Sequence, residues 1–443
     1  MRRSTTGTLI AGLAGLVTLT SGCGLQSDDV KPRQSGLANV VLISVDTLRA
    51  DHLGCYGYDR DTSPELDQLS RNAVVFEHAY AQAASTTMSH ASMLTSLWPP
   101  HHGASVQSRL PGNILTLAEV LSQQGYDTAS FNGGGQVGEE FGLDQGFTIY
   151  NSYTPDDTAQ IAAAARSWIA KSAARPFFLF LHTYETHQPY TPTLSALRLF
   201  EQGYEGPLPE REISVELLAS INAGKLAITD ADLRHVRNAY DAEIHSVDAQ
   251  LGQLLEFLKQ EELYDDTLIV VTSDHGEEFG EHGMVGWHSH SLYDELLHVP
   301  LIIKLPGSRR AGERVSTDVR SIDIAPTILV ALGLDPPPSF AGQPLAGPIA
   351  VALQPLPALS FTDGWGSQTS LRLFPWKFYD DQLYNLQADP EETTDVAPQN
   401  ASIAGEYSLK RKQLIDSRPA PEPERFSLSK RLRDRLKSLG YIR

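Results

Sequence analysis

The chain has 443 residues, of which 41% are hydrophobic, and can therefore bury one large core and a smaller second one. Its formal net charge of −19 argues against nucleic acid or an acidic membrane surface as a partner, because both are bound through Lys and Arg side chains that neutralise phosphates. A small anionic group can still be bound locally, by a metal ion.

The amino-terminal residues resemble an export signal. Two arginines precede an apolar stretch, 9–19, which is too short to span a membrane and is followed by small residues. Cys23 stands where a bacterial lipobox places its lipidated cysteine, although Thr20 occupies the usual leucine position. We therefore expect a lipoprotein signal peptide over 1–22 and a linker over 23–37. The protein is then exported to the cell envelope, in the periplasm or at the outer membrane or cell surface, and meets the membrane only through this anchor. An ordinary cleaved signal peptide is the alternative.

Three short apolar runs are typical of buried strands in a parallel sheet. They lie at 39–45, 176–181 and 267–273. Each run is followed by side chains that bind metals or anions: Asp46, His182, and Asp274 with His275. In an open α/β sheet, ligands bind at the carboxyl ends of the strands, so we expect these side chains to meet there.

Helical patterns lie between these runs. Their apolar residues keep a helical spacing over 115–124, 158–172 and 240–258. Strands that alternate with helices predict a mostly parallel sheet with helices on both faces. The glycine run at 133–135 lacks the spacing of a dinucleotide-binding motif and is expected to form a tight turn. Residues 191–232 are rich in Pro, Gly and mixed charge, which indicates an insertion near the site, with a lid as one candidate role.

The pattern changes near residue 341. The sequence becomes Pro-rich and then strand-like, so we expect a catalytic domain over 38–340 and a small α+β domain over 341–443. The final segment, 427–443, places four leucines on one helical face with basic residues around them. Docking of this helix on the body is the plain interpretation, and contact with a membrane surface or a partner is the alternative.

One segment, 86–96, reads Thr-Thr-Met-Ser-His-Ala-Ser-Met-Leu-Thr-Ser. Six other distinctive segments lie at 44–57, 98–103, 182–190, 272–276, 323–327 and 383–390. In this order, the segments resemble the sulfatase family of the alkaline phosphatase superfamily, whose signature reads Cys/Ser-x-Pro-Ser-Arg-x-x-x-Leu-Thr-Gly. The resemblance implies an α/β fold in which helices sandwich a large, mostly parallel sheet and a smaller C-terminal α+β domain follows.

The residues at the strand ends predict a metal site. Asp46, Asp274 and His275 are ligand types that can hold one divalent cation, with the Thr86 oxygen completing the site. Sulfatases commonly carry a second aspartate where this chain has Thr47, and often an asparagine where it has His275. The loss of a carboxylate and the gain of an imidazole shift the preference from Ca²⁺ toward Mn²⁺ or Zn²⁺, with Mg²⁺ still possible.

Thr86 occupies the position that sulfatases convert from Cys or Ser to formylglycine. Threonine has no route to that aldehyde, so we expect Thr86 to attack directly and to form a covalent ester that water hydrolyses. Such chemistry favours phosphoryl over sulfuryl transfer. Thr87 is the alternative nucleophile if the alignment shifts by one residue. His90 replaces the arginine that supports the aldehyde in sulfatases, and it is either catalytic or a helix-start residue bonded to backbone.

Histidines supply most of the remaining candidates. His187 lies in a segment that resembles the family's Asp-Pro-His-x-Pro-Tyr, where the histidine faces the substrate and can protonate a leaving oxygen. The other catalytic candidates are His90 and His290, and the substrate-binding candidates are His182, His288 and Arg49. For His182 and His288, packing or structural hydrogen bonding is an equal alternative.

A second metal is a less favoured possibility. Asp241 and His245 lie one helical turn apart and could hold it together with His290. The same stretch, 240–248, also resembles a structural helix of sulfatases, so we expect one metal.

These features predict a metal-dependent hydrolase of sulfate, phosphate or phosphonate esters that acts through Thr86 and not through formylglycine. Its substrate is a small anionic ester, free or carried by a glycan or lipid. The alternatives are a transferase that passes a head group to an alcohol, and a non-catalytic envelope lipoprotein that binds an anionic glycan or lipid. The sequence carries no signal for an oligomeric state.

Overall fold

A computed structural model describes residues 36–154, 157–172, 176–201, 203–345, 355–362 and 367–441. The predicted export signal, with Cys23, lies outside the described residues, as does almost all of the 23–37 linker. Within the described ranges, no helix combines the length and the apolar character needed to cross a membrane.

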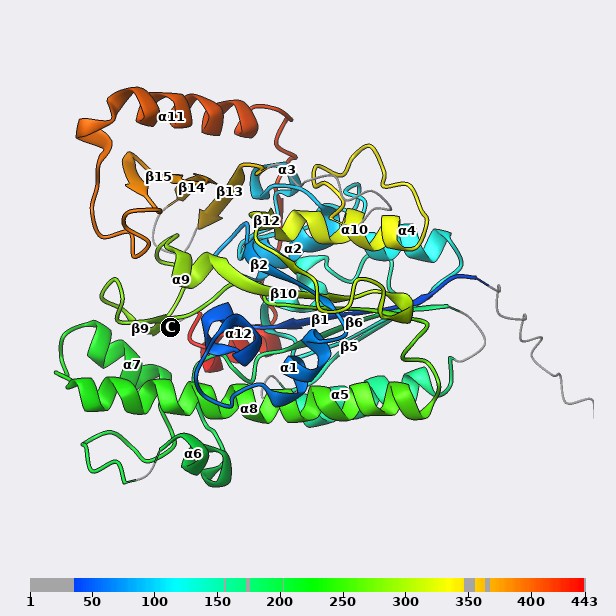
Figure 1. Ribbon diagram of the computed structural model, residues 1–443, viewed down its shortest axis with the longest axis horizontal. Coiled ribbons are helices and arrows are strands. Elements are labelled where there is room, and N and C mark those ends of the chain that lie inside the picture. The colour runs from blue at the N-terminus through cyan, green and yellow to red at the C-terminus, as the bar shows by residue number, and fades with distance from the viewer. Residues whose placement is uncertain are drawn as a thin grey trace, which may run out of the picture.

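A nine-stranded sheet forms the centre of the molecule (Figure 1). Its strands are β1 (Asn39–Val45), β2 (Val74–Tyr80), β4 (Asp127–Asn132), β5 (Ile149–Ser152), β6 (Phe177–Thr183), β7 (Thr267–Thr272), β10 (His298–Lys304), β11 (Arg314–Val315) and β12 (Val319–Arg320). The order is β11-β2-β10-β7-β1-β6-β4-β5, with β12 beside β2. β10 runs antiparallel to β2 and β7, and the other pairs are parallel. The mostly parallel sheet expected from the three apolar runs is therefore confirmed.

Helices cover both faces of this sheet (Figure 1). One layer contains α1 (Pro64–Ser70), α5 (Thr158–Ile169) and α8 (Asp230–Gln260), and the other contains α2 (Thr86–Thr95), α4 (Leu117–Gln123) and α10 (Ile324–Ala331). α8 starts earlier than the predicted helix over 240–258, because Thr229 and Asp232 form a capping box that satisfies its first backbone N–H groups.

The central strand β1 shows why the sheet is apolar on both sides. Val40 and Leu42 enter the hydrophobic core on the side of α2 and α4. Val41, Ile43 and Val45 enter the core on the side of α1, α5 and α8. Since successive side chains of a strand point to opposite faces, a strand between two helical layers needs an unbroken apolar run.

The region 191–232 contains two short helices. α6 (Leu194–Phe200) packs along α8, and α7 (Val215–Asn222) contacts β9 (Val285–Trp287), which pairs with β8 (Glu278–Phe279). Its role as a lid stays a prediction. The glycine run at 133–135 forms a turn after β4, as expected, with positive φ at Gly134 and Gly135.

A smaller α+β unit follows. Its antiparallel sheet contains β13 (Ala358–Thr362), β14 (Gln368–Leu373), β15 (Trp376–Tyr379) and β16 (Gln382–Asn385). The helix α11 (Ala401–Ile415) contacts β14 and β15 (Figure 1). Leu359, Leu371, Phe378 and Tyr407 lie in the same small core. This unit is the smaller α+β part that the sequence predicts.

A cluster of buried charges joins the two sheets. The Lys377 Nζ atom lies 2.8 Å from Asp294 Oδ1 and 2.7 Å from Glu392 Oε1. Arg372 contacts Asp294 at 2.7 Å and Asp318 at 3.1 Å. Asp294 begins α9 (Asp294–Leu297), which precedes β10 of the large sheet, whereas Arg372 and Lys377 belong to the small one. We call these five residues the interface charge cluster.

The last helix, α12 (Lys430–Ser438), returns to the large core. Leu432, Leu436 and the following Leu439 are buried there, as the docking interpretation of its pattern predicts. Arg435 also donates a hydrogen bond to the Tyr153 carbonyl. The remaining short elements are α3 (Pro99–His102), β3 (Ser108–Arg109) and β17 (Glu424–Arg425), and β17 pairs with β3.

Candidate active site

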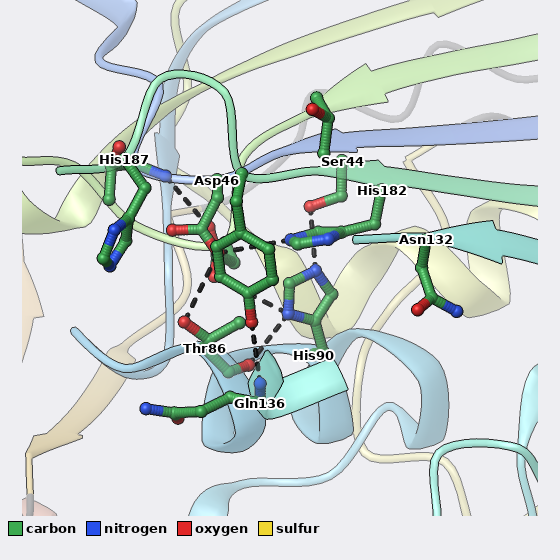
Figure 2. A network of polar contacts seen from close by, with 12 residues as sticks. Ser44, Asp46, Thr86, His90, Asn132, Gln136, His182 and His187 are labelled. Carbon is green, nitrogen blue, oxygen red and sulfur yellow. Dashed lines mark hydrogen bonds and ion pairs between the residues drawn. The ribbon is translucent and has the colours of Figure 1, made fainter. Parts of the chain in front are cut away.

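Three parallel neighbours, β7, β1 and β6, bring the predicted ligands together. The register pairs Ser44 of β1 with His182 on one side and with Thr272 on the other. Asp46 and Asp274, each just past the end of its strand, therefore project from the same edge of the sheet. Asp46 lies between Thr86 and His182 (Figure 2). These side chains have no exposed surface.

Thr86 is the first residue of α2, after an extended Ser85. Its Oγ1 atom lies 3.4 Å from Asp46 Oδ2 and 3.5 Å from His275 Nε2. Thr87 instead donates its hydroxyl to the Gln136 carbonyl at 2.8 Å. The contacts thus favour Thr86 over Thr87 as the nucleophile. The positive end of the α2 dipole also favours negative charge at this position.

The residues present fit a divalent cation. Asp46 Oδ1 and Asp274 Oδ2 are buried and have no hydrogen-bond partner among the described residues. The His275 Nδ1 atom lies 3.0 Å from the Gly276 carbonyl and therefore carries the hydrogen, which leaves the Nε2 lone pair available. One ligand atom from each of Asp46, Asp274 and His275 lies within 4.8 Å of the others. Burial, together with the charge of Asp274, raises the pKa of Asp46 well above its usual range. A bound cation would offset both carboxylates.

His90 has partners for both ring nitrogens. Its Nδ1 atom lies 2.8 Å from the Thr86 carbonyl, and its Nε2 atom lies 2.9 Å from Ser44 Oγ. Burial lowers the pKa of His90, so the ring is neutral. His90, His182 and Asp274 also lie close enough to hold a metal. However, His90 has no free lone pair, because Nδ1 donates to the carbonyl and Nε2 accepts from the serine. These contacts favour the alternative of a helix-start residue bonded to backbone.

His182 contacts the metal-site carboxylate. Its Nε2 atom lies 3.2 Å from Asp46 Oδ2, and its Nδ1 atom has no partner among the described residues. Burial and the neighbouring His90 lower the pKa of His182 well below its usual range. A neutral imidazole at this position holds Asp46 in place. The contacts therefore favour structural hydrogen bonding, while substrate binding stays a prediction.

His187 and His288 lie side by side, with ring centroids 4.8 Å apart. The His187 Nδ1 atom donates to the Gln188 carbonyl at 2.5 Å, which leaves Nε2 as an acceptor without a partner among the described residues. Burial and the nearby His288 lower the pKa of His187 to about 3. His288 Nδ1 lies 2.9 Å from Glu277 Oε1, and its ring centroid lies 4.6 Å from that of His275. Both rings are placed beside the metal-site residues.

Two candidates have partners elsewhere. The His290 Nε2 atom lies 2.6 Å from Glu278 Oε2. Arg49 directs its guanidinium to Asp51 and Glu281, each at 2.8 Å. These contacts do not point to a substrate, and the roles of His290 and Arg49 stay predictions.

The contacts of Asp241 and His245 do not favour the second-metal alternative. The Asp241 oxygens are taken by His52 at 2.7 Å, by Tyr58 at 2.8 Å and by Arg60 at 2.5 Å. The His245 Nδ1 atom lies 3.2 Å from the Asp61 carbonyl. The helical spacing of Asp241 and His245 is real, but Arg60 already supplies the cation that this aspartate needs.

Two further residues of the site belong to none of the motifs found in the sequence. The Tyr441 hydroxyl lies 2.9 Å from Thr86 Oγ1, and Tyr441 follows α12, far away in sequence. Glu277, which orients His288, directly follows the Asp274-His275-Gly276 motif. Because Glu277 directly follows a motif, its place in the site could have been predicted from the sequence. No spacing rule connects Tyr441 to Thr86, since their contact depends on where the last helix docks.

The chain is similar to known sulfatases. Human iduronate 2-sulfatase is 28% identical over 71% of this chain and 69% of its own length. An N-acetylglucosamine-6-O-sulfatase from Bacteroides thetaiotaomicron is 23% identical over 93% of this chain and 90% of its own length.

Solved structures share the fold. The phosphonate monoester hydrolase of Agrobacterium radiobacter superposes with a TM-score of 0.69, 24% identity, and coverage of 85% of this chain and 95% of that one. A protein solved with its substrate D-glucosamine-2-N,6-O-disulfate gives a TM-score of 0.71, 20% identity, and coverage of 87% and 100%.

The family model described as Sulfatase matches residues 38–334, which include every strand of the large sheet and every candidate ligand of the metal site. The chain therefore belongs to the sulfatase family of ester hydrolases.

Proposed function

We propose that the protein is a metal-dependent hydrolase of sulfate, phosphate or phosphonate esters in which Thr86, and not a formylglycine, attacks the sulfur or phosphorus. One observation carries this proposal. Thr86 Oγ1 lies at the start of a helix, 3.4 Å from Asp46 and 3.5 Å from His275, while the adjacent Thr87 is bonded elsewhere.

The site residues have complementary roles in this reaction. A divalent cation held by Asp46, Asp274 and His275 would lower the pKa of the Thr86 hydroxyl and offset charge on the transferred group. The Thr86 oxygen loses its hydroxyl proton as it forms the new bond, and the ester oxygen leaves with its electron pair and takes up one proton, so that no proton is gained or lost in the step. Water then hydrolyses the threonine ester. His187 Nε2 presents a lone pair that can accept the proton of this water.

The relatives support two classes of substrate. Proteins named for sulfated sugars, an iduronate and an N-acetylglucosamine, support a sulfate ester on a glycan. The shared fold with a phosphonate monoester hydrolase supports a phosphorus ester. Direct attack by threonine is known chemistry for phosphoryl groups, so we propose that phosphorus esters are turned over alongside sulfate esters.

The test compares four esters and three proteins. Metal-reconstituted wild type is assayed on an aryl sulfate, a phosphate monoester, a phosphodiester and a phosphonate monoester, beside Thr86→Ala and the matched control Thr87→Ala. We expect Thr86→Ala to lower kcat by about a thousandfold or more, because it removes the nucleophile. Thr87→Ala should keep most activity, because the hydrogen bonds described for the Thr87 side chain go to Gln136 and not to the metal-site residues.

Two results would overturn the proposal. Turnover that survives Thr86→Ala would remove Thr86 as the nucleophile. Failure to hydrolyse any ester by a protein that still binds metal would favour the non-catalytic alternative. Intact mass of the peptide containing Thr86 checks that the residue is unmodified.

We also propose that the protein is exported and anchored in the cell envelope through Cys23. The supporting signal is the charged start, the short apolar stretch and the small residues before this cysteine. Cys23→Ser should convert membrane-associated protein into a soluble form when cell fractions are separated. Equal membrane association of both forms would contradict the lipid anchor.

A further inference from the structure

The proposed nucleophile is completely covered. Thr86, Asp46 and His275 have no exposed surface, and His187 has 1%. Part of this cover comes from Tyr441, whose hydroxyl lies 2.9 Å from Thr86 Oγ1. Its ring centroid stands 5.2 Å from that of His187 and 5.8 Å from that of His288. A substrate ester cannot reach Thr86 while Tyr441 stands there.

The Tyr441 hydroxyl and Thr86 Oγ1 are within hydrogen-bond distance, and either oxygen can be the donor. Thr86 Oγ1 also lies 3.4 Å from Asp46 Oδ2. The Tyr441 oxygen thus occupies a place beside the nucleophile.

The segment that carries Tyr441 packs between the helix α7 and the glycine turn at 133–135. A Cβ atom on Gly440, where φ is +80°, would come within 2.8 Å of Val215 Cγ1 in α7. A Cβ atom on Gly135 would come within 2.9 Å of Leu439 Cδ1. The backbone at Gly440 therefore lies close to the Val215 side chain, and the Leu439 side chain lies close to the backbone at Gly135. Both glycines have a positive φ, which a larger residue would adopt only with strain.

α12 itself is a weak anchor. It is a nine-residue helix whose buried side chains are Leu432 and Leu436, with Leu439 just beyond its end. Helices of this length are marginal in isolation and depend on their packing. A helix held by a narrow apolar stripe can detach without disturbing the sheet, because the core cluster that it joins is mostly built by other elements.

We propose that the segment Leu439–Tyr441 is a removable closure of the active site, in which Tyr441 holds the place that an oxygen of the substrate takes beside Thr86. This proposal deepens the proposed function and depends on the assignment of Thr86. Binding of substrate displaces the phenol from Thr86 and lifts the end of α12. Tyr441 thereby determines access to the site and the size of ester that enters.

The test measures access without turnover. Diethyl pyrocarbonate acylates accessible neutral histidines, and mass spectrometry locates each modified residue. In wild type, His187 should react slowly. In Tyr441→Ala, the rate at His187 should rise about tenfold or more, since opening of the cover limits the reaction. His245, at the surface of α8, is the internal reference and should react equally in both proteins.

Two further variants separate closure from other effects. Tyr441→Phe keeps the ring but loses the bond to Thr86, so its labelling rate should lie between those of wild type and Tyr441→Ala. Tyr407→Phe is the matched control, because that buried tyrosine donates to the Leu373 carbonyl in the small unit. It should leave labelling of His187 unchanged.

Ligand binding gives a second readout. Inorganic phosphate, titrated calorimetrically into metal-loaded protein, should bind Tyr441→Ala up to about tenfold more tightly if wild type is closed about 90% of the time. The two proposals fail differently. Faster labelling of Tyr441→Ala in a protein that hydrolyses no ester would keep the closure and remove the function. Unchanged labelling and affinity, with turnover that requires Thr86, would remove the closure and keep the function. Loss of turnover in Tyr441→Phe without faster labelling would make Tyr441 a catalytic group and overturn the closure.

Discussion

Two clusters of carboxylates, one partly buried and one fully buried, differ in how the chain balances their charge. The interface charge cluster contains Asp294, Asp318 and Glu392, and the chain supplies Arg372 and Lys377 within 3.1 Å. At the sheet edge, the described side-chain contacts of Asp46 and Asp274 are to threonine, serine and histidine, and none is to Lys or Arg.

Three of the histidines near the sheet edge do not supply the missing charge. Burial lowers the pKa values of His90, His182 and His187, so these rings are neutral near neutral pH. An uncompensated buried carboxylate is costly, and proteins pair it or bind a metal with it. The comparison teaches that the first cluster is complete as folded, whereas the second is built for a cation from solution.

The largest expected effect comes from a substitution in the interface charge cluster. Lys377→Met should lower the free energy of unfolding by about 3–5 kcal/mol, because Asp294 and Glu392 lose a partner in a buried site. Urea unfolding measures the change. Lys412→Met is the control, since the Lys412–Asp416 pair is exposed and such pairs contribute about 0–1 kcal/mol. Equal effects of the two substitutions would show that the interface charge cluster contributes no more than a surface pair.

The next largest effect concerns stabilisation by a cation bound at the sheet edge, beside Asp46 and Asp274. A divalent cation at a hundred times its Kd should stabilise wild type by about 2.7 kcal/mol, and EDTA should reverse this together with ester turnover. Thermal unfolding with Mn²⁺, Zn²⁺, Mg²⁺ and Ca²⁺ ranks the ions, and elemental analysis gives the stoichiometry.

The controls for metal binding are two aspartates. Asp274→Asn should abolish the stabilisation, because it removes a proposed ligand. Asp241→Asn should keep one metal per chain, since Asp241 is paired with Arg60 and His52. Loss of metal in Asp241→Asn would restore the two-metal alternative.

The smallest effect concerns pH. Burial acts to raise the pKa of Asp294, but the charges of Arg372 and Lys377 outweigh it and hold this pKa well below its usual range. The resulting stability is present above the ordinary carboxyl pKa of about 4 and is lost as pH falls toward the folded value, by about 2 kcal/mol. Urea midpoints between pH 6 and 3 should fall less steeply in Asp294→Asn, and parallel curves would contradict the assignment.

The sequence predicted the parts of the fold that depend on local pattern. The unbroken run before Asp46 indicated a central strand, and parallel neighbours then required Asp46, His182 and Asp274 to share one edge. Spacing along a helix does not show whether a side chain is already paired. Asp241 and His245 have the spacing of ligands, yet Arg60, from a distant loop, neutralises Asp241. Tyr441 could not be foreseen either, since its contact with Thr86 depends on how a helix docks after the sheet is complete.

The register of β1 against β7 has a consequence for the order of events during folding. The proposed metal ligands follow strands that lie about 230 residues apart in the sequence. The side-chain contact between Asn39 and Thr267, at a separation of 228 residues, joins these same two strands. Such distant pairing is slow to form, and we expect the complete set of ligands to come together only when β1 and β7 have paired. We therefore expect the metal to bind only after the whole sheet has formed. The ion then stabilises the folded protein and does not nucleate its folding.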